Sequence, residues 1–287
     1  MLTITLKVIK VLMNSYKPSE TETPRLLAHA RLNKVLLGIL RKLNLEGRDR
    51  QLEELKYKRY LIGVKLVASL LKDINYALYK FRKPVDHVSV DIDLLVDSNN
   101  ISRAVKRLLS KGFDVVVVEP YTVTLKYGSI VVDLYTYPAF AWAIYMDAER
   151  ILKNYVEDIA IDDIYVRALT RDAEVVVTLA HALYKEHIYL ISDYFVINSW
   201  LNRGALSATY EFSLIDELKY FLTLNNMISR GLIDAPYKIP QGYVTKEYVK
   251  LFAQNNLFRG TATNIFKYLL SERSGRIILW KLTRKSY

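Results

Sequence analysis

Apolar residues recur at helical spacing over the first part of the chain. After the polar segment Ser19–Pro24, which has the composition of a helix start, they lie three or four positions apart up to about Leu43. Gly47 interrupts this pattern, and a second helical periodicity runs over Gln51–Leu71. Residues 1–15 fit either a helix or a strand. The pattern therefore predicts a helical N-terminal region.

The central part changes to the alternation of apolar and polar residues that is typical of strands. His87–Val96 is rich in β-branched residues and predicts a strand, and Ile101–Lys111 predicts a helix that Gly112 ends. Three further strands are expected in a meander, at Phe113–Val118, Tyr121–Lys126 and Ser129–Tyr135.

The remainder returns to helical patterns. We expect a helix over 138–156, short strands over 158–168, a helix over 173–187, and helices with loops from there to Tyr287. The fold class predicted is α/β (α+β), with a small mixed, mostly antiparallel sheet flanked by helices. The expected divisions are a helical N-terminal region (1–60), a core (61–169) and a helical C-terminal region (170–287).

The composition narrows the classes of function. The chain has 287 residues and no cysteine, which excludes disulfides, zinc fingers, iron–sulfur clusters and cysteine nucleophiles. No apolar stretch approaches the ~20 residues of a bilayer span, and Met1–Met13 has no cleavage pattern. We therefore expect a cytoplasmic protein with no membrane partner. Its abundant Tyr, Ile, Val and Lys are also typical of heat-adapted proteins.

The charge is strongly positive, at +11 from 41 Lys and Arg against 30 Asp and Glu. This excess favours polyanionic partners such as nucleotides or nucleic acid, with a basic surface that serves solubility as the alternative. A basic cluster near the C-terminus either contacts RNA or DNA or forms a solvated terminal helix. It comprises Arg273, Arg276, Lys281, Arg284 and Lys285, with Trp280 and Tyr287 interleaved.

Two aspartates stand out in the predicted strand over 87–96. Because side chains alternate along a strand, His87, Ser89, Asp91 and Asp93 are expected on one face. Neighbouring carboxylates repel each other unless a cation or water separates them, and an Asp-x-Asp pair can chelate Mg²⁺. The pattern predicts a metal site. An exposed strand end, capped by both aspartates, is the alternative.

A third aspartate, Asp133, lies between apolar residues in the last strand of the meander. A charge inside such a strand is unfavourable unless it is paired or binds a metal. If this strand lies beside that of Asp91 and Asp93, three carboxylates converge. They could then hold two Mg²⁺ ions that position a nucleoside triphosphate and activate an attacking hydroxyl. Pairing of Asp133 with a lysine is the alternative.

The segment Asn75–Val96 resembles the core of the polymerase-β-type nucleotidyltransferase superfamily, most closely its branch of abortive-infection toxin-like enzymes. Ala77-Leu78 and Ser89–Leu94 match the small and apolar residues and the Ser-x-Asp-hydrophobic-Asp of that branch. The resemblance covers roughly residues 70–136, with a looser continuation to about 195. It implies a nucleotidyltransferase-like core at 61–169, whose catalytic metal ligands are Asp91, Asp93 and Asp133.

The resemblance also indicates where a nucleotide binds. The family has a glycine pair where this chain has Asn75 and its neighbour, so nucleotide contacts are expected at Asn75 and Ser89. Lys80, Arg82 and Lys83 in the same segment could bind phosphates in place of the backbone contacts that glycines allow. A solvated basic turn is the alternative for these three residues.

A second polar cluster follows at 181–193. His181 and Lys185 are four residues apart and share a helix face. The resemblance implies that Lys185 binds the triphosphate and that Asp193 belongs to the Lys-Asp-type segment of the toxin-like branch. An amphipathic helix with solvated charges is the alternative. A zinc site of His181, His187 and Asp193 is a further one.

These residues predict Mg²⁺-dependent transfer of a nucleoside monophosphate from an NTP to the hydroxyl of an acceptor, with RNA and protein both open. One alternative is a nucleotidyltransferase-fold protein of weak or absent activity that binds nucleotide, RNA or a protein partner. Another is one half of a toxin–antitoxin pair, which would meet its antitoxin-like partner through the N-terminal helices.

Overall fold

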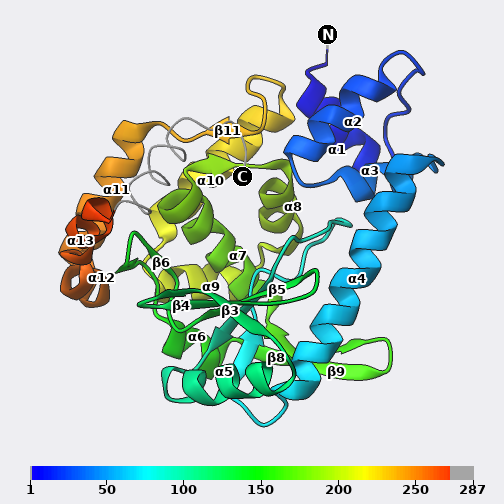
Figure 1. The fold of residues 1–287 in the computed structure, drawn as a ribbon. Coiled ribbons are helices and arrows are strands. Elements are labelled where there is room, and N and C mark those ends of the chain that lie inside the picture. The colour runs from blue at the N-terminus through cyan, green and yellow to red at the C-terminus, as the bar shows by residue number, and fades with distance from the viewer. Residues whose placement is uncertain (1, 272–287) are drawn as a thin grey trace.

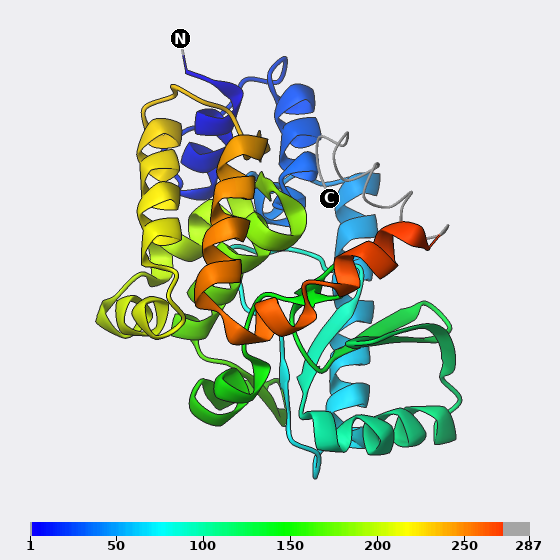
Figure 2. The same ribbon diagram turned by 90° about the vertical axis from the view of Figure 1, so that its left-hand side faces the viewer.

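The computed structural model describes residues 2–271, and the basic cluster after Glu272 lies outside them. A mixed sheet lies against a layer of helices (Figure 1), which confirms the predicted fold class. Figure 2 shows the helical layer on one side and the β3–β4 hairpin with α5 on the other. None of the helices in the described part of the chain has both the length and the apolar character that a bilayer span requires.

The main sheet has seven strands in the order β3-β4-β5-β2-β1-β9-β8. Strand β2 pairs in parallel with β5 and β1 in parallel with β9, whereas the other neighbours are antiparallel. The strands are β1 (Tyr76–Leu78), β2 (Ile92–Val96), β3 (Asp114–Glu119), β4 (Thr122–Tyr127), β5 (Ile130–Tyr135), β8 (Val156–Ile161) and β9 (Ile164–Leu169). The sheet is mixed and mostly antiparallel, as the sequence predicts.

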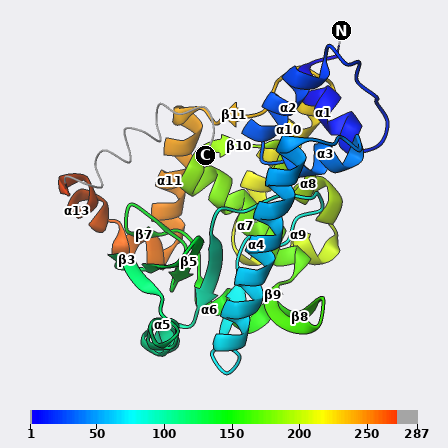
Figure 3. The same ribbon diagram turned by 45° about the vertical axis from the view of Figure 1, so that its right-hand side comes forward.

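One face of this sheet is covered by two helices. The long helix α4 (Arg48–Leu70) contacts β2, β5, β9 and α5 (Ile101–Ser110), and Figure 3 shows it crossing the molecule from the N-terminal helices to the far end of the sheet. Ile92 and Leu94 of β2 and Val132 and Leu134 of β5 are buried in this layer. Since side chains alternate along a strand, Asp93 and Asp133 point to the opposite face.

The opposite face meets the helical layer. Helices from both ends of the sequence share one hydrophobic core there. The Asn33 side chain links the two ends, because its Nδ2 donates to the Ala235 carbonyl (3.0 Å) and its Oδ1 accepts from the Ile191 N–H (3.0 Å). The helices are α1 (Ile4–Leu12), α2 (Thr23–Leu32), α3 (Leu36–Lys42), α6 (Ala148–Asn154), α7 (Arg171–Ala180), α8 (Ile191–Trp200), α9 (Arg203–Glu211), α10 (Ile215–Ser229), α11 (Gln241–Gln254), α12 (Asn256–Thr261) and α13 (Asn264–Leu270).

Short elements complete the fold. A π-helical turn, η2 (His181–Glu186), continues α7, and a 3₁₀ turn, η1 (Ser98–Asn100), precedes α5. Two small antiparallel sheets of two strands each lie outside the main sheet. They are formed by β6 (Ala139–Phe140) with β7 (Ala143–Ile144), and by β10 (Ile188–Tyr189) with β11 (Tyr237–Lys238).

The helix predicted over 138–156 is wrong in its first half. Residues 139–144 form the β6–β7 hairpin, and α6 begins only at Ala148. Ala141 and Trp142 occupy the two turn positions with φ of 48° and 63°. Two successive left-handed residues make the type of turn that matches the twist of a hairpin, and neither residue type announces it in the sequence.

Three other elements differ from the expectation. The strand predicted over 87–96 covers only Ile92–Val96, and residues 79–91 form a loop that follows β1, a strand the sequence did not predict. The helix expected up to Leu43 is divided into α2 and α3, since Lys34 between them has a left-handed backbone (φ 56°). The helix expected over 173–187 ends as the π-helical turn η2.

Candidate active site

A cavity of about 570 Å³, here called the carboxylate cleft, lies between the sheet and the helical layer. Residues of β2 and β5 line it from the sheet side, and residues of α7, η2 and α8 line it from the other. The loop over 79–91 closes one flank. The charged groups that matter below are Asp91, Asp93 and Asp133 together with Lys34, Lys80, Lys83 and Lys185.

Loop 79–91 is fixed to α3 by a close backbone approach. The Gly38 N–H donates to the Asp86 carbonyl (3.0 Å), and a Cβ on Gly38 would lie 3.1 Å from that oxygen. Arg41 adds an ion pair to the Asp86 carboxylate at 3.0 Å. Only glycine leaves the loop this close to the helix without a shift, so the sequence of α3 helps to set where the loop residues enter the cleft.

The three aspartates converge because of the strand register. In the parallel ladder of β2 and β5, Asp93 lies opposite Asp133, and Asp91 lies just before β2. One carboxylate oxygen of each residue lies within 4.8 Å of the others. The strand of Asp133 thus runs beside that of Asp93, which is the condition on which the predicted convergence depended.

The contacts of these carboxylates fit a divalent cation. Asp93 is only 8% exposed, and its Oδ1 is buried without a hydrogen-bond partner. Thr124 Oγ1 donates to Asp133 Oδ1 (2.5 Å), and Ser89 Oγ donates to Asp91 Oδ1 (3.3 Å). Carboxylate oxygens are the ligands that Mg²⁺ prefers, and a buried carboxylate oxygen without a donor is unfavourable until a cation or a donor reaches it.

The environment of Asp133 also shifts its acidity. Burial raises the pKa of Asp133 above the usual value, and the negative charges of Asp93 and Asp91 raise it further. The hydrogen bond from Thr124 acts in the other direction. Without a bound cation, Asp133 is therefore a stronger base than an ordinary aspartate.

Lys80 points directly at this cluster. Its Nζ lies 2.9 Å from Asp93 Oδ2 and 3.3 Å from His181 Nε2, and its side chain is 17% exposed. Burial lowers the pKa of Lys80, but the charges of Asp93 and Asp91 outweigh this and hold the pKa above its ordinary value. Lys80 is therefore an ammonium ion among the carboxylates.

Three more lysines face the cleft. Burial and the neighbouring charge of Lys80 lower the pKa of Lys34 and of Lys185 to about 8. Lys185 donates to the Tyr135 hydroxyl (3.4 Å), and Lys83 lies 4.0 Å from Asp193 Oδ1. At neutral pH Lys34 and Lys185 are mostly cationic, and with Lys83 they form a basic wall that can donate hydrogen bonds to phosphate oxygens.

The π-helical turn η2 brings two residues of the second polar cluster to the cleft. His181 and Lys185 both line it, and His181 lies 3.5 Å from Glu186 as well as against Lys80. The turn ends at His187, whose backbone is left-handed (φ 56°). Single π-helical turns within helices are frequent at functional sites.

The remaining predicted residues divide into two groups. Ser89, Lys80, Lys185 and Asp193 line the cleft, and Asp193 accepts the Leu190 N–H (3.1 Å) at the start of α8. Asn75 and Arg82 do not line it. Asn75 lies before β1, at the end of the ladder away from Asp93, where it contacts Asp97 (3.4 Å) and Arg167 (3.2 Å). Arg82 pairs with Glu157 and donates to the Leu169 carbonyl (3.3 Å).

The zinc alternative is not supported within residues 2–271. The group of possible metal ligands found there is that of Asp91, Asp93 and Asp133, and His181, His187 and Asp193 do not form one. His187 instead packs edge-on against Phe140 and Tyr248.

The sequence analysis did not identify Lys34 or a role for His87 in the cleft. Lys34 comes from the turn between α2 and α3, which is remote in sequence, and no local pattern marks it. Burial and the charges of Lys83 and Lys34 lower the pKa of His87 to about 3, so its imidazole is neutral at physiological pH. A neutral ring can accept or donate one hydrogen bond without adding charge.

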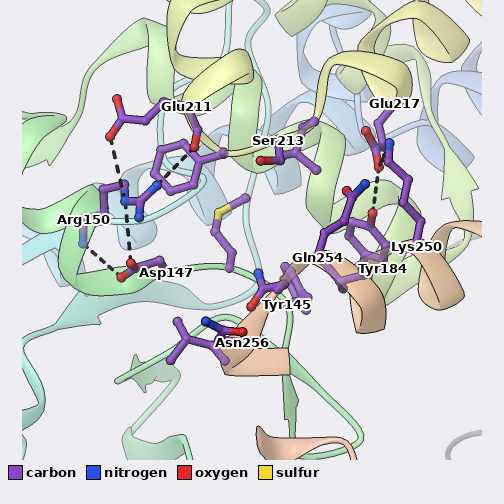
Figure 4. Close-up of a pocket in the computed structure, with 16 residues that line it drawn as sticks. Tyr145, Asp147, Arg150, Tyr184, Glu211, Ser213, Glu217, Lys250, Gln254 and Asn256 are labelled. Carbon is purple, nitrogen blue, oxygen red and sulfur yellow. Dashed lines mark hydrogen bonds and ion pairs between the residues drawn. The ribbon is translucent and has the colours of Figure 1, made fainter. Parts of the chain in front are cut away.

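A second cavity of about 290 Å³, here called the helical pocket, lies between α6, α9, α10 and α11 (Figure 4). Tyr184 of η2 donates to Glu217 Oε1 (2.9 Å) at one end, where Lys250 also lies. Arg150 faces Asp147 and Glu211 at the other end. Since Tyr184 lines this pocket and its neighbour Lys185 lines the carboxylate cleft, η2 contributes to both cavities.

No protein-family model matches the sequence, and no curated protein matches it. Among solved structures, a lincosamide antibiotic adenylyltransferase, LnuA, bound to lincomycin is similar over 48% of this chain and 94% of its own, with 15% identity and a TM-score of 0.36.

Two structures of the antibiotic-resistance factor ANT(2″)-Ia are also similar. The complex with adenylyl-2″-tobramycin covers 53% of this chain and 95% of its own, with 14% identity and a TM-score of 0.41. The solution structure covers 61% and 97%, with 13% identity and a TM-score of 0.38. All three TM-scores are below 0.5, so the function proposed below rests on the residues of the carboxylate cleft.

Proposed function

We propose that this protein is a Mg²⁺-dependent nucleotidyltransferase that moves a nucleoside monophosphate from an NTP to an acceptor hydroxyl. One observation carries the proposal: three carboxylates from neighbouring strands converge within 4.8 Å of one another beside a wall of lysines. Asp91, Asp93 and Asp133 are the ligands proposed for the metal. A bound Mg²⁺ supplies charge stabilisation at the α-phosphate and brings a hydroxyl closer to its alkoxide form.

The proposed reaction exchanges one phosphoester bond for another. The acceptor hydroxyl oxygen forms a bond to the α-phosphorus, and the bond from this phosphorus to the oxygen bridging to the β-phosphate breaks. The electron pair of the broken bond leaves with pyrophosphate. The hydroxyl proton passes to the Asp133 carboxylate, which belongs to the same converging group.

Three lysines of the cleft share one role in this proposal. Phosphate oxygens are bound by Lys34, Lys83 and Lys185. Their positive charge offsets the negative charge of the triphosphate and of the leaving pyrophosphate. Ser89 orients Asp91 through its hydrogen bond (3.3 Å). Asn75 and Arg82 have no part in it, since they lie outside the cleft.

Transfer of an α-phosphate label to an acceptor tests the proposal. The full chain is incubated with Mg²⁺ and each of the four α-labelled ribonucleoside triphosphates, in the presence of total RNA or total protein as acceptors. We expect label transfer by the wild type and by Glu217→Gln, and none by Asp93→Asn or Asp133→Asn. Transfer that survives in both aspartate variants would rule the proposal out.

A second candidate is a protein that binds nucleotide without transferring it. The ion pair between Lys80 and Asp93 (2.9 Å) favours it, because it uses one carboxylate oxygen that a metal would otherwise contact. In that case a thermal shift with NTP occurs in the wild type, whereas no label reaches any acceptor. The two assays therefore separate the candidates.

The toxin-like role is a finer proposal, supported by the resemblance of Asn75–Val96 to the toxin-like branch. It predicts growth arrest when the wild-type chain is expressed, and normal growth with Asp93→Asn. An antitoxin-like partner would relieve the arrest and co-purify with both forms. Growth that is equal for the wild type and Asp93→Asn would contradict a toxin role but leave the transfer reaction open.

A further inference from the structure

The carboxylate cleft already contains a cation supplied by the chain itself. Lys80 Nζ lies 2.9 Å from Asp93 Oδ2, inside the range of a charge-assisted hydrogen bond. The other oxygen of the same carboxylate, Oδ1, is buried and has no hydrogen-bond donor. One side of Asp93 is thus paired with an ammonium ion, and the other side is left for a second cation.

The backbone at Lys80 supports a specific role for this side chain. Lys80 follows β1 directly and has a left-handed conformation, with φ of 56°. This conformation is unfavourable for a residue with a Cβ atom, because the Cβ then crowds the backbone. Such a conformation persists where the surroundings hold it, and it is enriched at functional sites. Here the ion pair with Asp93 and the contact with His181 (3.3 Å) hold the side chain in place.

The rings beside Lys80 hold it further. Its Nζ lies 5.3 Å from the ring centre of Tyr79 and 5.9 Å from that of Tyr135. Aromatic faces attract an ammonium ion and exclude water from it. These contacts make Lys80 a fixed charge, in contrast to a solvated surface lysine.

The charges of the cluster set how many further cations it can take. The three aspartates carry three negative charges, of which the ammonium of Lys80 balances one. One divalent cation balances the other two. A second divalent ion would leave an excess of two positive charges beside Lys185, which itself donates to Tyr135 at 3.4 Å. Like charges in a buried site repel each other strongly, because the local dielectric constant is low.

We propose that the ammonium of Lys80 fills one of the two cation positions predicted for these carboxylates, so that each chain binds a single divalent ion at Asp91, Asp133 and Oδ1 of Asp93. The inference rests on the proposed function, because it concerns the number of metal ions in the proposed active site. Lys80 is then a positioning residue for Asp93 and a permanent counter-charge at the cluster.

The number of bound Mn²⁺ ions per chain tests this inference. Mn²⁺ is titrated into the full-length protein without nucleotide, and free Mn²⁺ is followed by electron paramagnetic resonance. We expect one ion per chain for the wild type and two for Lys80→Met. Lys83→Met is the matched control, since it removes a lysine of the same cleft that lies near Asp193 (4.0 Å), and its count should stay at one.

A second variant keeps the test decisive if Lys80→Met does not fold. Lys80→Gln retains a hydrogen-bond donor for Asp93 without the charge, and it should also bind two ions. Lys80→Arg retains the charge and should bind one.

Each other outcome has a defined meaning. Two ions in the wild type, or an unchanged count in both Lys80→Met and Lys80→Gln, overturn the inference and leave the proposed function standing. If neither the wild type nor these variants bind Mn²⁺, the metal-dependent function fails as well. The two failures are therefore distinguishable.

Discussion

The carboxylate cleft and the helical pocket both place a lysine among carboxylates, but in different arrangements. In each, a lysine side chain with limited exposure lies beside three carboxylates, and of those around Lys250 it is Glu217 that lines the helical pocket. Lys80 is 17% exposed and faces the aspartates of the cleft, and Lys250 is 23% exposed and lies 2.8, 3.5 and 3.7 Å from its carboxylates. These carboxylates are Asp216, Glu217 and Glu247.

The difference lies in the elements that carry the acids. In the cleft, paired strands set Asp93 opposite Asp133, so oxygens of all three aspartates converge. Around Lys250 the acids come from α10 and α11, and within residues 2–271 they do not form a group of possible metal ligands. Both regions contain a buried carboxylate oxygen without a hydrogen-bond donor, at Asp93 and at Glu217. Such an oxygen alone therefore does not mark a metal site, whereas convergence on a shared position does.

The largest expected effect separates the two regions by metal binding. Asp93→Asn should weaken Mn²⁺ binding by at least about 100-fold, since even residues behind the ligands change metal affinity by roughly 10–100-fold. Glu217→Gln should leave the affinity unchanged. Isothermal titration of both variants checks this. Equal losses in the two variants would remove the distinction between the regions.

The next effect concerns stability without metal. Lys80→Met leaves Asp93 buried and unpaired, and removal of one partner of a buried ion pair costs about 3–5 kcal/mol of the free energy of unfolding. Saturating Mg²⁺ should restore most of this. Lys250→Met should lower the free energy of unfolding by about 1–3 kcal/mol, as expected for leaving a buried polar group unsatisfied, and Mg²⁺ should not restore it. Urea unfolding with and without Mg²⁺ measures both, and recovery of Lys250→Met by Mg²⁺ would contradict the comparison.

A carboxyl outside both regions extends the comparison to pH. Glu174 is buried; its Oε1 accepts the Arg82 N–H (3.1 Å), and its Oε2 has no donor. Burial raises the pKa of Glu174 from 4.5 to about 7, so the folded state favours the protonated form. Its contribution to the free energy of unfolding is therefore highest below pH 4.5, where the Glu174 carboxyl is protonated in both the folded and the unfolded state. This contribution decreases as the pH rises to about 7, because the unfolded state ionises first.

Glu174→Gln tests this sign. The variant should be more stable than the wild type at pH 7.5 by up to roughly 3 kcal/mol, because one pKa unit corresponds to about 1.4 kcal/mol. The difference should vanish at pH 4. Thermal or urea unfolding across this range measures it, and a variant that is less stable at pH 7.5 would show that Glu174 is ionised and paired.

The smallest expected effect lies within the cleft. Ser89→Ala removes the hydrogen bond to Asp91 (3.3 Å) and should weaken Mn²⁺ binding about threefold, in line with roughly 0.5–1 kcal/mol for one such bond. Ser192→Ala is the matched control, since Ser192 contacts Asp193 (3.5 Å) instead of the metal cluster. A titration that shows equal changes in both variants would exclude orientation of Asp91 by Ser89.

The acids of the cleft could be predicted because each leaves a local signal. Asp93 and Asp133 interrupt apolar strands, and a charge in such a position needs a partner. The lysines leave no comparable signal. Lys34 faces the cleft because α2 ends at Leu32 and leaves Lys34 in the turn before α3. Arg82 lies in the same basic segment as Lys80, but its side chain pairs with Glu157.

Prediction of the fold from the sequence is limited in the same way. The meander over 114–135 was predictable because alternation is a property of the strand itself. The β6–β7 hairpin was not, since its left-handed turn at Ala141 and Trp142 depends on the surroundings. Strand β1 was missed because it has three buried residues and hence no alternation of apolar and polar positions.

The position of Lys80 in the chain bears on the order of folding. Asp93 follows Lys80 by thirteen positions in the sequence, whereas Asp133 follows Asp93 by forty. Closing a short loop loses less chain entropy than closing a long one, and antiparallel pairing of β1 with β2 needs only the short one. Parallel pairing of β2 with β5 then places Asp133 directly opposite Asp93, and two like charges across a ladder repel each other. The Lys80 ammonium, which reaches Asp93 across the shorter loop, offsets this repulsion, so the sheet can form with both aspartates in place before any metal is bound.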